Sequence, residues 1–371
     1  MSGFAIRGWC PDAWHPMAAG DGLLVRVRPR LGRLNRKQVL GLCDAALTFG
    51  NGLIDLTRRG NFQLRGVSEA EWPALIVRLV ELELVEADPV HEKKRNLLVA
   101  PIWQEADDTA RIAAELIARL GELPELPGKV GFVIDAGAVP VLPGEAGDFR
   151  IERAAGGSLI LRAQGRTAGA EVTAGAEVDR LIAMARWFAE NGGPEAGRMS
   201  RFTAELPEWA QGSLLPARGS CPLQPGPTST GAAWGVPFGQ ISALALARLI
   251  SDPAATALRT TPWRLLIVEG AAFAPVEGLV DDPADPLLRV DACPGAPSCP
   301  QASVETRALA RRIAPQVTGR LHVSGCAKRC AATGRADVTL IGREGRYDLS
   351  GEGRERLALG RDEVLALFGA G

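Results

Sequence analysis

Two stretches of the chain share the same alternation of apolar and polar positions. Between Gly20 and Val67 the pattern predicts a strand, a helix and a strand, and a second helix follows between Glu69 and Leu84. The segment from Gly231 to Gly270 repeats the order strand, helix, strand. Gly32 and Gly239 open the two helices and lie 207 residues apart. A β-α-β unit repeated at this distance predicts two halves of one pseudo-symmetric domain, although such units are common enough for a chance match.

Two further segments combine helices and strands. In residues 89–210 the pattern predicts an apolar run at 96–103, a helix at 108–120, a strand at 129–137, a hairpin at 149–165 and a helix at 177–192. In residues 285–371 it predicts a helix at 304–314, strands at 320–325 and 335–342, and a last helix at 361–369. The segment from Pro207 to Gly231 is rich in Pro, Gly and Ser, which indicates a surface connection at the join of the two halves.

Composition narrows the class of protein. The chain has 371 residues, 46% of them hydrophobic and 23% charged, which is enough for two or three domains with cores of their own. The formal net charge of -1 argues against a dedicated nucleic-acid binder. Neither a membrane-spanning run nor a signal-peptide core is recognisable. We therefore expect a cytoplasmic protein, in which clustered cysteines hold metal more often than they form disulfides.

Four cysteines near the C-terminus carry the clearest chemical signal. Five residues separate Cys293 from Cys299, and three separate Cys326 from Cys330. Prolines and a glycine bend the first segment, and the spacing of the second pair would place both thiols on one side of a helical turn. Four thiolates suit a tetrahedral zinc ion or an iron-sulfur cluster.

Zinc and an accidental grouping are the simpler interpretations of these cysteines. Structural zinc sites space their cysteines by two to four residues, which fits the wider gap of the first pair poorly. Free cysteine is often buried in a core, but four of the seven cysteines fall within 38 residues. Of the other three, Cys43 belongs to an apolar helical pattern and is predicted to be core, whereas Cys10 and Cys221 precede prolines and suggest no role.

Arginine greatly exceeds lysine, and it clusters in the first hundred residues. Only five of the 42 basic residues are lysine. Forked guanidinium groups are good partners for carboxylates, so the cluster favours a polycarboxylated small ligand. Its members are Arg26, Arg28, Arg30, Arg33, Arg36, Arg58, Arg59, Arg65 and Arg95.

The cysteine spacing, the duplicated half and the segment LTRRGNFQLRGV at Leu56–Val67 together resemble the nitrite and sulfite reductase hemoprotein superfamily. This resemblance implies an α+β fold, with duplicated ferredoxin-like half-domains forming one pseudo-symmetric domain and two α/β domains beside it. The domain boundaries that we expect are 1–88 and 211–284 for the half-domains, 89–210 for a tetrapyrrole-binding domain and 285–371 for a cluster-binding domain.

The resemblance also assigns roles to individual residues. It implies that Cys293, Cys299, Cys326 and Cys330 bind a 4Fe-4S cluster, and in the reductases the last of the four also bridges to siroheme iron. Arg59, Arg65, Arg95 and Lys129 match positions that contact the tetrapyrrole or the anion. The reductases carry a second lysine where this chain has Gly131, so reduction of a small oxyanion is less well supported than the fold.

Four further segments resemble an oxygen-dependent subgroup from aerobic cobalamin biosynthesis. This similarity implies that a siroheme-like tetrapyrrole is the substrate: precorrin-3A would be hydroxylated by dioxygen at C20 and a γ-lactone closed from the ring A acetate. A siroheme-dependent nitrite or sulfite reductase is the alternative, and a non-catalytic tetrapyrrole or metal carrier is a third. The segments are Arg7–Pro29, Gly235–Gly239, Thr260–Arg264 and Asp291–Ala302.

The subgroup implies a mononuclear non-heme iron beside the cluster. Such irons often have two histidines and a carboxylate as ligands, for which His15, His91 and Glu92 are the candidate set. His322 lies in an apolar strand and is interpreted as a packed core residue or a hydrogen-bond donor to a cluster sulfur. No dinucleotide fingerprint follows a strand, so electrons would come from a separate reductase or ferredoxin-like carrier. The sequence identifies no catalytic residue.

Overall fold

The two halves of the repeat exchange a strand. The computed structural model describes residues 11–351 and 353–370, and two of its sheets have the orders β1-β2-β5-β4-β13 and β11-β12-β15-β14-β3. Strand β13 of the second half pairs antiparallel with β4, and β3 of the first half pairs antiparallel with β14. The exchange joins both halves into one body, as the repeat predicts.

The strands of these two sheets are short. The first sheet contains β1 (Met17–Ala19), β2 (Gly22–Val27), β5 (Phe62–Val67), β4 (Leu53–Leu56) and β13 (Gln240–Ser242). The second contains β11 (Gly226–Pro227), β12 (Gly231–Gly235), β15 (Leu265–Glu269), β14 (Ala257–Thr260) and β3 (Arg33–Asn35).

The same tight turn precedes the exchanged strand in each half. Leu31 and Gly32 have φ angles of 51° and 68°, and Phe238 and Gly239, each 207 positions later, have φ angles of 57° and 72°. Left-handed backbone costs little at glycine but is unfavourable at leucine and phenylalanine. The shared strained turn therefore supports a true structural repeat.

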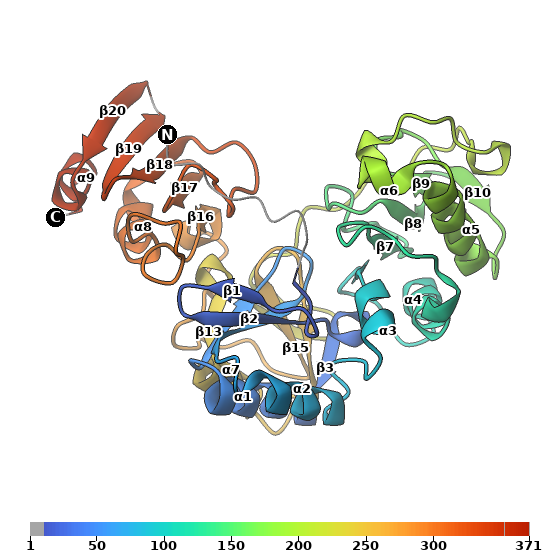
Figure 1. Cartoon of the computed structure of the whole chain (residues 1–371), viewed down its shortest axis with the longest axis horizontal. Coiled ribbons are helices and arrows are strands. Elements are labelled where there is room, and N and C mark those ends of the chain that lie inside the picture. The colour runs from blue at the N-terminus through green and yellow to red at the C-terminus, as the bar shows by residue number, and fades with distance from the viewer. Residues whose placement is uncertain (1–10, 352, 371) are drawn as a thin grey trace.

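A polar residue at the end of each exchanged strand starts the helix that follows. Asn35 accepts a hydrogen bond from the amide of Gln38 and caps α1 (Arg36–Phe49), and Ser242 does the same for α7 (Ala243–Leu249). With α2 (Trp72–Glu81), these helices cover one side of the central body in Figure 1. Their apolar faces and both sheets enclose one continuous core.

A second body carries the sheet β10-β9-β8-β7-β6, seen at the upper right of Figure 1. Strands β6, β7 and β8 are parallel, and β9 and β10 continue the sheet antiparallel. Helices α4 and α5 pack against it through a core rich in phenylalanine. The elements are α3 (Pro89–Lys94), β6 (Leu97–Val99), α4 (Asp108–Ala118), β7 (Phe132–Asp135), β8 (Phe149–Arg153), β9 (Leu159–Ala163), β10 (Ala170–Val172), α5 (Glu177–Glu190) and α6 (Gly193–Ala196).

The third body carries the cysteines, and its sheet has the order β16-β17-β18-β19-β20. Helices α8 and α9 pack on one face of this sheet. The sequence pattern missed β16, β19 and β20, which are short or largely exposed. The elements are β16 (Val290–Ala292), α8 (Arg307–Ile313), β17 (Leu321–Ser324), β18 (Val338–Arg343), β19 (Arg346–Gly351), β20 (Arg354–Leu359) and α9 (Arg361–Leu367).

One local prediction in this body is wrong. The segment from Cys326 to Cys330 forms turns instead of a helical turn. Arg329 within it has a φ angle of 53°, which a right-handed helix does not allow. Within residues 11–351 and 353–370, no helix is long and apolar enough to span a membrane.

Candidate functional site

A strongly basic cavity of about 490 Å³ lies between the first sheet of the central body and the β6–β10 body. Arginine contributes seven lining residues, from β2 and its end, the β4–β5 turn, β8, β9 and the segment after α6. Among the residues that the structure describes, Lys129 adds an eighth cation, and Glu145 is the only acidic residue in the lining. The arginines are Arg26, Arg28, Arg58, Arg59, Arg150, Arg162 and Arg198.

Two of the four predicted tetrapyrrole-binding residues line this cavity. Arg59 is half-buried in the β4–β5 turn, and its Nη1 donates to Oδ1 of Asn96 at 3.0 Å. Lys129 is exposed at the wall. A Cβ added to Gly131 would overlap Nη1 of Arg59 and would lie 2.9 Å from the backbone oxygen of Asn96. Arg59 therefore takes space that a side chain at position 131 would need.

Several cations of the wall are fixed from behind by buried carboxylates. Glu152, which is 1% exposed, lies 3.2 Å from Nε of Arg150 and also accepts from Arg162. Asp148 lies 3.5 Å from Nη1 of Arg198 and accepts the amide of Gly131 at 3.0 Å. These pairs hold the guanidinium groups in place before any ligand arrives.

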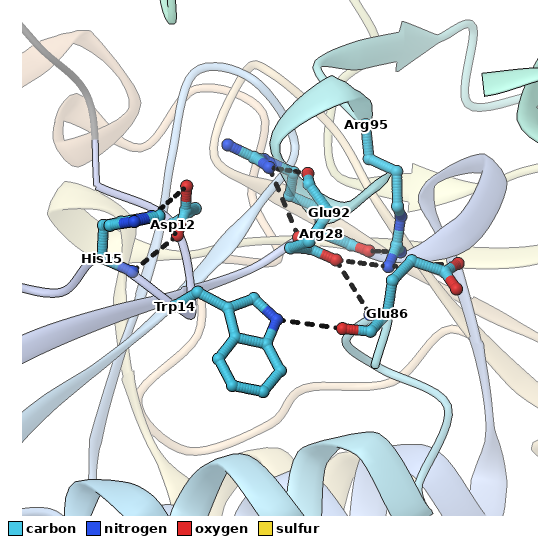
Figure 2. Close-up of polar contacts among 7 residues, drawn as sticks. All are labelled: Asp12, Trp14, His15, Arg28, Glu86, Glu92 and Arg95. Carbon is cyan, nitrogen blue, oxygen red and sulfur yellow. Dashed lines mark hydrogen bonds and ion pairs between the residues drawn. The ribbon is translucent and has the colours of Figure 1, made fainter. Parts of the chain in front are cut away.

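Arg95, the third predicted ligand-binding residue, lies outside the lining of the basic cavity. It is 5% exposed, and its Nη1 is 2.7 Å from Oε2 of the fully buried Glu92 (Figure 2). The other oxygen of Glu92 is 3.3 Å from Nη1 of Arg28, which does line the cavity. Arg95 also donates to the carbonyl of Arg28. In this conformation Arg95 therefore supports Arg28 rather than facing the cavity.

Arg65, the fourth, is 3% exposed and bound by two carboxylates of the chain. Its Nε and Nη2 are each 2.9 Å from an oxygen of Asp21, and its Nη1 is 2.9 Å from Oδ2 of Asp55. Nη2 also lies 3.4 Å from the carbonyl of Ser298 in the first cysteine loop. Arg65 therefore joins the first half-domain to the cysteine loop.

The histidine and carboxylate set predicted for a mononuclear iron is not assembled. Nδ1 of His15 lies 3.2 Å from Asp12 (Figure 2), and Nδ1 of His91 lies 2.9 Å from Asp88. Glu92 is held between two arginines. Throughout the described part of the chain, no three His, Cys, Asp or Glu side chains converge closely enough to hold one metal ion. The residues described do not fit a mononuclear iron.

His15 lines a second cavity, of about 590 Å³, beside the basic one. Arg28 and Gly128 line both cavities, whereas Trp14 and Pro16 give the second an apolar wall. The indole nitrogen of Trp14 donates to the carbonyl of Glu86 at 3.0 Å, which fixes that wall (Figure 2).

The cysteine loops follow the ends of two neighbouring parallel strands. Cys293 comes directly after β16, and Cys326 follows β17 by two residues. The amide of Gly325 donates to Sγ of Cys293 at 3.2 Å. Burial raises the pKa of Cys330, Lys328 opposes this shift, and the charges of the other three thiols raise the pKa further.

Four neighbouring thiols are the donor set of an iron-sulfur cluster. Cys293 is buried, Cys299 and Cys326 are half-buried, and Cys330 is exposed. Within the described residues, no three of these thiols converge on one metal-ion position, which does not favour zinc. The residues therefore fit a multi-iron cluster better than a tetrahedral zinc site.

Asp291 fastens the second cysteine loop. Its Oδ2 accepts the amide of Thr333 at 3.1 Å, and its Oδ1 lies 3.2 Å from Nη2 of Arg264 in the second half-domain. His322 on the adjacent strand is 1% exposed, and neither ring nitrogen has a hydrogen-bond partner in the described structure. Burial lowers the pKa of His322. His322 is thus packed in the sheet, and its hydrogen bond to a cluster sulfur stays a prediction.

Of the remaining cysteines, the two that the structure describes lie in different surroundings. Cys43 is buried in the central core, where burial raises its pKa to about 12, and Cys221 is exposed. Cys10 lies outside the described residues.

Glu145 was not identified from the sequence, because it lies in a loop of prolines and glycines with no periodic pattern. It is half-buried, and its Oε1 accepts the indole N–H of Trp263 at 3.1 Å. Burial raises the pKa of Glu145, although Arg58, Trp263 and Arg150 act in the opposite direction. Trp263 belongs to the segment Thr260–Arg264, which was noted only as a motif.

Comparison with known proteins agrees with this architecture. Residues 15–82 match the family model of the nitrite/sulfite reductase ferredoxin-like half domain. The NirA protein of Mycobacterium tuberculosis has the same fold, with a TM-score of 0.57 and 19% identity over 91% of this chain and 76% of its own.

Two curated relatives match almost the whole chain. A ferredoxin–nitrite reductase of Synechococcus elongatus is 25% identical over 92% of this chain and 80% of its own length. A precorrin-3B synthase of a Sinorhizobium species is 32% identical over 92% of this chain and 82% of its own length. With the ferredoxin-like half domain and the NirA-like fold, this match shows that the chain belongs to the precorrin-3B synthase family of the nitrite and sulfite reductase superfamily.

Proposed function

We propose that the protein is an oxygen-dependent enzyme that hydroxylates precorrin-3A at C20 and closes a γ-lactone from the ring A acetate. One observation supports this most: within the described part of the chain, eight cations and a single acid line a cavity of about 490 Å³. Such a wall suits a ligand with carboxylates around its rim, because charge-assisted hydrogen bonds are stronger than neutral ones.

The reaction balances with one reductant. One atom of dioxygen enters the tetrapyrrole, the other leaves as water, and two electrons and two protons are consumed. Cys293, Cys299, Cys326 and Cys330 would hold a 4Fe-4S cluster, which supplies single electrons when bound. A separate reductase or a ferredoxin-like carrier would deliver the electrons from outside.

The protein side chains bind and orient the substrate. Arg59 and Lys129 reach the basic cavity directly, and Glu92 and Arg95 fix Arg28 at its edge. Arg65 would take part if a substrate carboxylate replaced Asp21 or Asp55. The neighbouring cavity gives the tetrapyrrole an apolar surface at Trp14 and Pro16.

Siroheme-dependent reduction of nitrite or sulfite is the second candidate, favoured by the 25% identity to a nitrite reductase. A substrate leaves the protein chemically changed, whereas a prosthetic group stays. Cluster-loaded protein should therefore be supplied with precorrin-3A, reductant and air, then separated from small molecules. We expect an oxidised tetrapyrrole in the small-molecule fraction and no siroheme absorbance in the protein. Retained siroheme with consumption of nitrite or sulfite would contradict the proposal.

A further inference from the structure

Among the residues that the structure describes, Glu145 is the only carboxyl group in the lining of the basic cavity. It lies in the loop between β7 and β8, where hydrogen bonds of its backbone fix its position. Its amide donates to the carbonyl of Leu142 at 3.1 Å, and its carbonyl accepts from Nη1 of Arg150 at 2.7 Å. The side chain therefore starts from a fixed point on the wall.

The two carboxylate oxygens of Glu145 have different surroundings. Oε1 accepts the indole N–H of Trp263, a residue that packs beside this loop with Val133 and Leu142. Oε2 has no hydrogen-bond or ion-pair partner within the portion of the chain described, and it is not sealed from solvent. One oxygen is thus held by Trp263, while the other keeps its lone pairs available on a residue that lines the cavity. This arrangement suits exchange of a proton with a bound molecule.

The other carboxylates around the cavity are committed. Glu152 pairs with Arg150 and Arg162, Glu92 pairs with Arg28 and Arg95, and Asp148 accepts backbone amides. Their oxygens are already bound by arginines or backbone amides, whereas Oε2 of Glu145 is not.

We propose that Glu145 takes up a proton when a tetrapyrrole polycarboxylate fills the cavity and donates that proton in the reaction. This inference rests on the proposed function, whose stoichiometry consumes two protons, and Glu145 would supply one of them. No bond other than O–H is broken at Glu145, and the carboxylate regains its proton from solvent when the next substrate binds.

Electrostatics gives the reason for proton uptake. In the free protein, Arg58, Arg150 and Arg59 favour the charged form of Glu145 and partly offset its burial. Substrate carboxylates would neutralise these cations and bring further negative charge close to Oε2. Both changes raise the pKa of the carboxyl group, so binding draws a proton from solvent. The charged groups that face Glu145 across the cavity are Arg26, Arg28, Arg58, Arg59, Lys129, Arg150, Arg162 and Arg198.

Proton uptake can be measured without turnover. Anaerobic calorimetric titration with precorrin-3A, in buffers of different ionisation enthalpy, gives the number of protons bound per complex. We expect uptake at near-neutral pH in the wild type, its loss in Glu145→Gln, and binding of the variant at least as tight because a like charge is removed. Glu171→Gln, at the exposed position of strand β10, makes the same charge change elsewhere and should keep the uptake.

Turnover provides the second readout. Glu145→Gln should lower kcat by on the order of 10²-fold, typical for loss of a general acid, without raising KM. It should also remove the pH dependence that belongs to a carboxyl group, whereas Glu145→Asp should keep that dependence with a lower rate. Trp263→Phe, which deletes the hydrogen bond to Oε1, should have a kcat between those of the Glu145→Gln and Glu145→Asp variants.

The outcomes separate the two claims. If Glu145→Gln binds precorrin-3A with unchanged proton uptake, or turns over with wild-type kcat and pH profile, the role of Glu145 is overturned and the proposed function stands. If the wild type binds precorrin-3A but does not oxidise it, the proposed function fails, while loss of uptake in the variant still supports the protonation of Glu145.

Discussion

Oε2 of the fully buried Glu92 lies 2.7 Å from Nη1 of Arg95, and the other oxygen of the same carboxylate faces Arg28 at 3.3 Å. One carboxylate thus compensates two buried guanidinium groups from different bodies of the protein. The amide of Glu86 adds a hydrogen bond of 3.0 Å to Oε2. The wall of the basic cavity is therefore tied to the protein interior at Arg28.

Removing this carboxylate should destabilise the fold strongly. Glu92→Ala would remove the carboxylate beside Arg28 and leave Arg95 with only the more distant Glu86, at 3.7 Å. Breaking a buried pair on one side costs about 3–5 kcal/mol. Urea unfolding followed by circular dichroism measures the change. Glu81→Ala on the exposed side of α2 is the matched control and should stay within about 0.5 kcal/mol of the wild type. Equal stability of the two variants would refute the buried network.

Arg59 and Lys129 should each contribute to tetrapyrrole affinity. Arg59→Ala and Lys129→Ala remove charged hydrogen-bond donors from the basic cavity, which should weaken precorrin-3A binding by about 1.5–3 kcal/mol for Arg59 and less for the more exposed Lys129. Fluorescence or absorbance titration under anaerobic conditions gives the affinity. Arg346→Ala, on the remote strand β19, should bind normally. Unchanged affinity in both cavity variants would place the ligand elsewhere.

Each of the four clustered cysteines should be needed for the iron-sulfur centre. Cys293→Ser or Cys326→Ser should abolish the broad visible absorbance of a cluster and lower the iron and sulfide content of the purified protein. Cys221→Ser, at an exposed position outside the cysteine loops, should retain both. Full iron content in the Cys293 and Cys326 variants would show that other residues hold the metal.

The free energy of unfolding should fall in acid because Glu269 forms ion pairs that join the two half-domains. Nη2 of Arg33 lies 2.7 Å from Oε2 of Glu269, and Arg259 reaches the other oxygen. Burial raises the pKa of Glu269, but these hydrogen bonds and charges outweigh it and hold the pKa below its ordinary value. The stabilisation is therefore full above the ordinary glutamate pKa of about 4.3 and is lost as the pH falls through the lower folded-state value.

Substituting Glu269 tests this pH dependence. Glu269→Gln should lower the free energy of unfolding by about 2 kcal/mol at neutral pH, since charged hydrogen bonds are lost. The difference from the wild type should shrink as the pH falls below the ordinary glutamate pKa of about 4.3, which urea titrations at several pH values would show. A difference that is constant with pH would exclude the ion pair as its source.

The repeat and the cysteine pairs were the parts of the molecule that sequence could reveal. Gly32 and Gly239 occupy the same left-handed turn in both halves. Because this backbone conformation favours glycine, the turn could be recognised in the sequence. Local periodicity also predicted the long amphipathic helices, because their buried faces recur every three or four positions.

Contacts between residues far apart in the sequence could not be predicted from local patterns. Strands β3 and β13 have three residues each, too few for an alternating pattern, so their exchange between the sheets could not be predicted. The contact between Arg28 and Glu92 joins residues 64 positions apart. For Arg95, resemblance suggested a ligand-binding role, whereas the buried Glu92 holds it in the protein interior.

Labelled dioxygen tests the proposed activity most directly. Cluster-loaded protein, reductant and precorrin-3A would be mixed without oxygen, exposed to the heavy isotope, and the tetrapyrrole analysed by mass spectrometry. An oxygenase acting in this basic cavity predicts a hydroxylated, lactonised product that carries one labelled oxygen atom. An unlabelled and unchanged tetrapyrrole that stays on the protein, together with consumption of nitrite or sulfite, would contradict that activity and identify the ring as a cofactor.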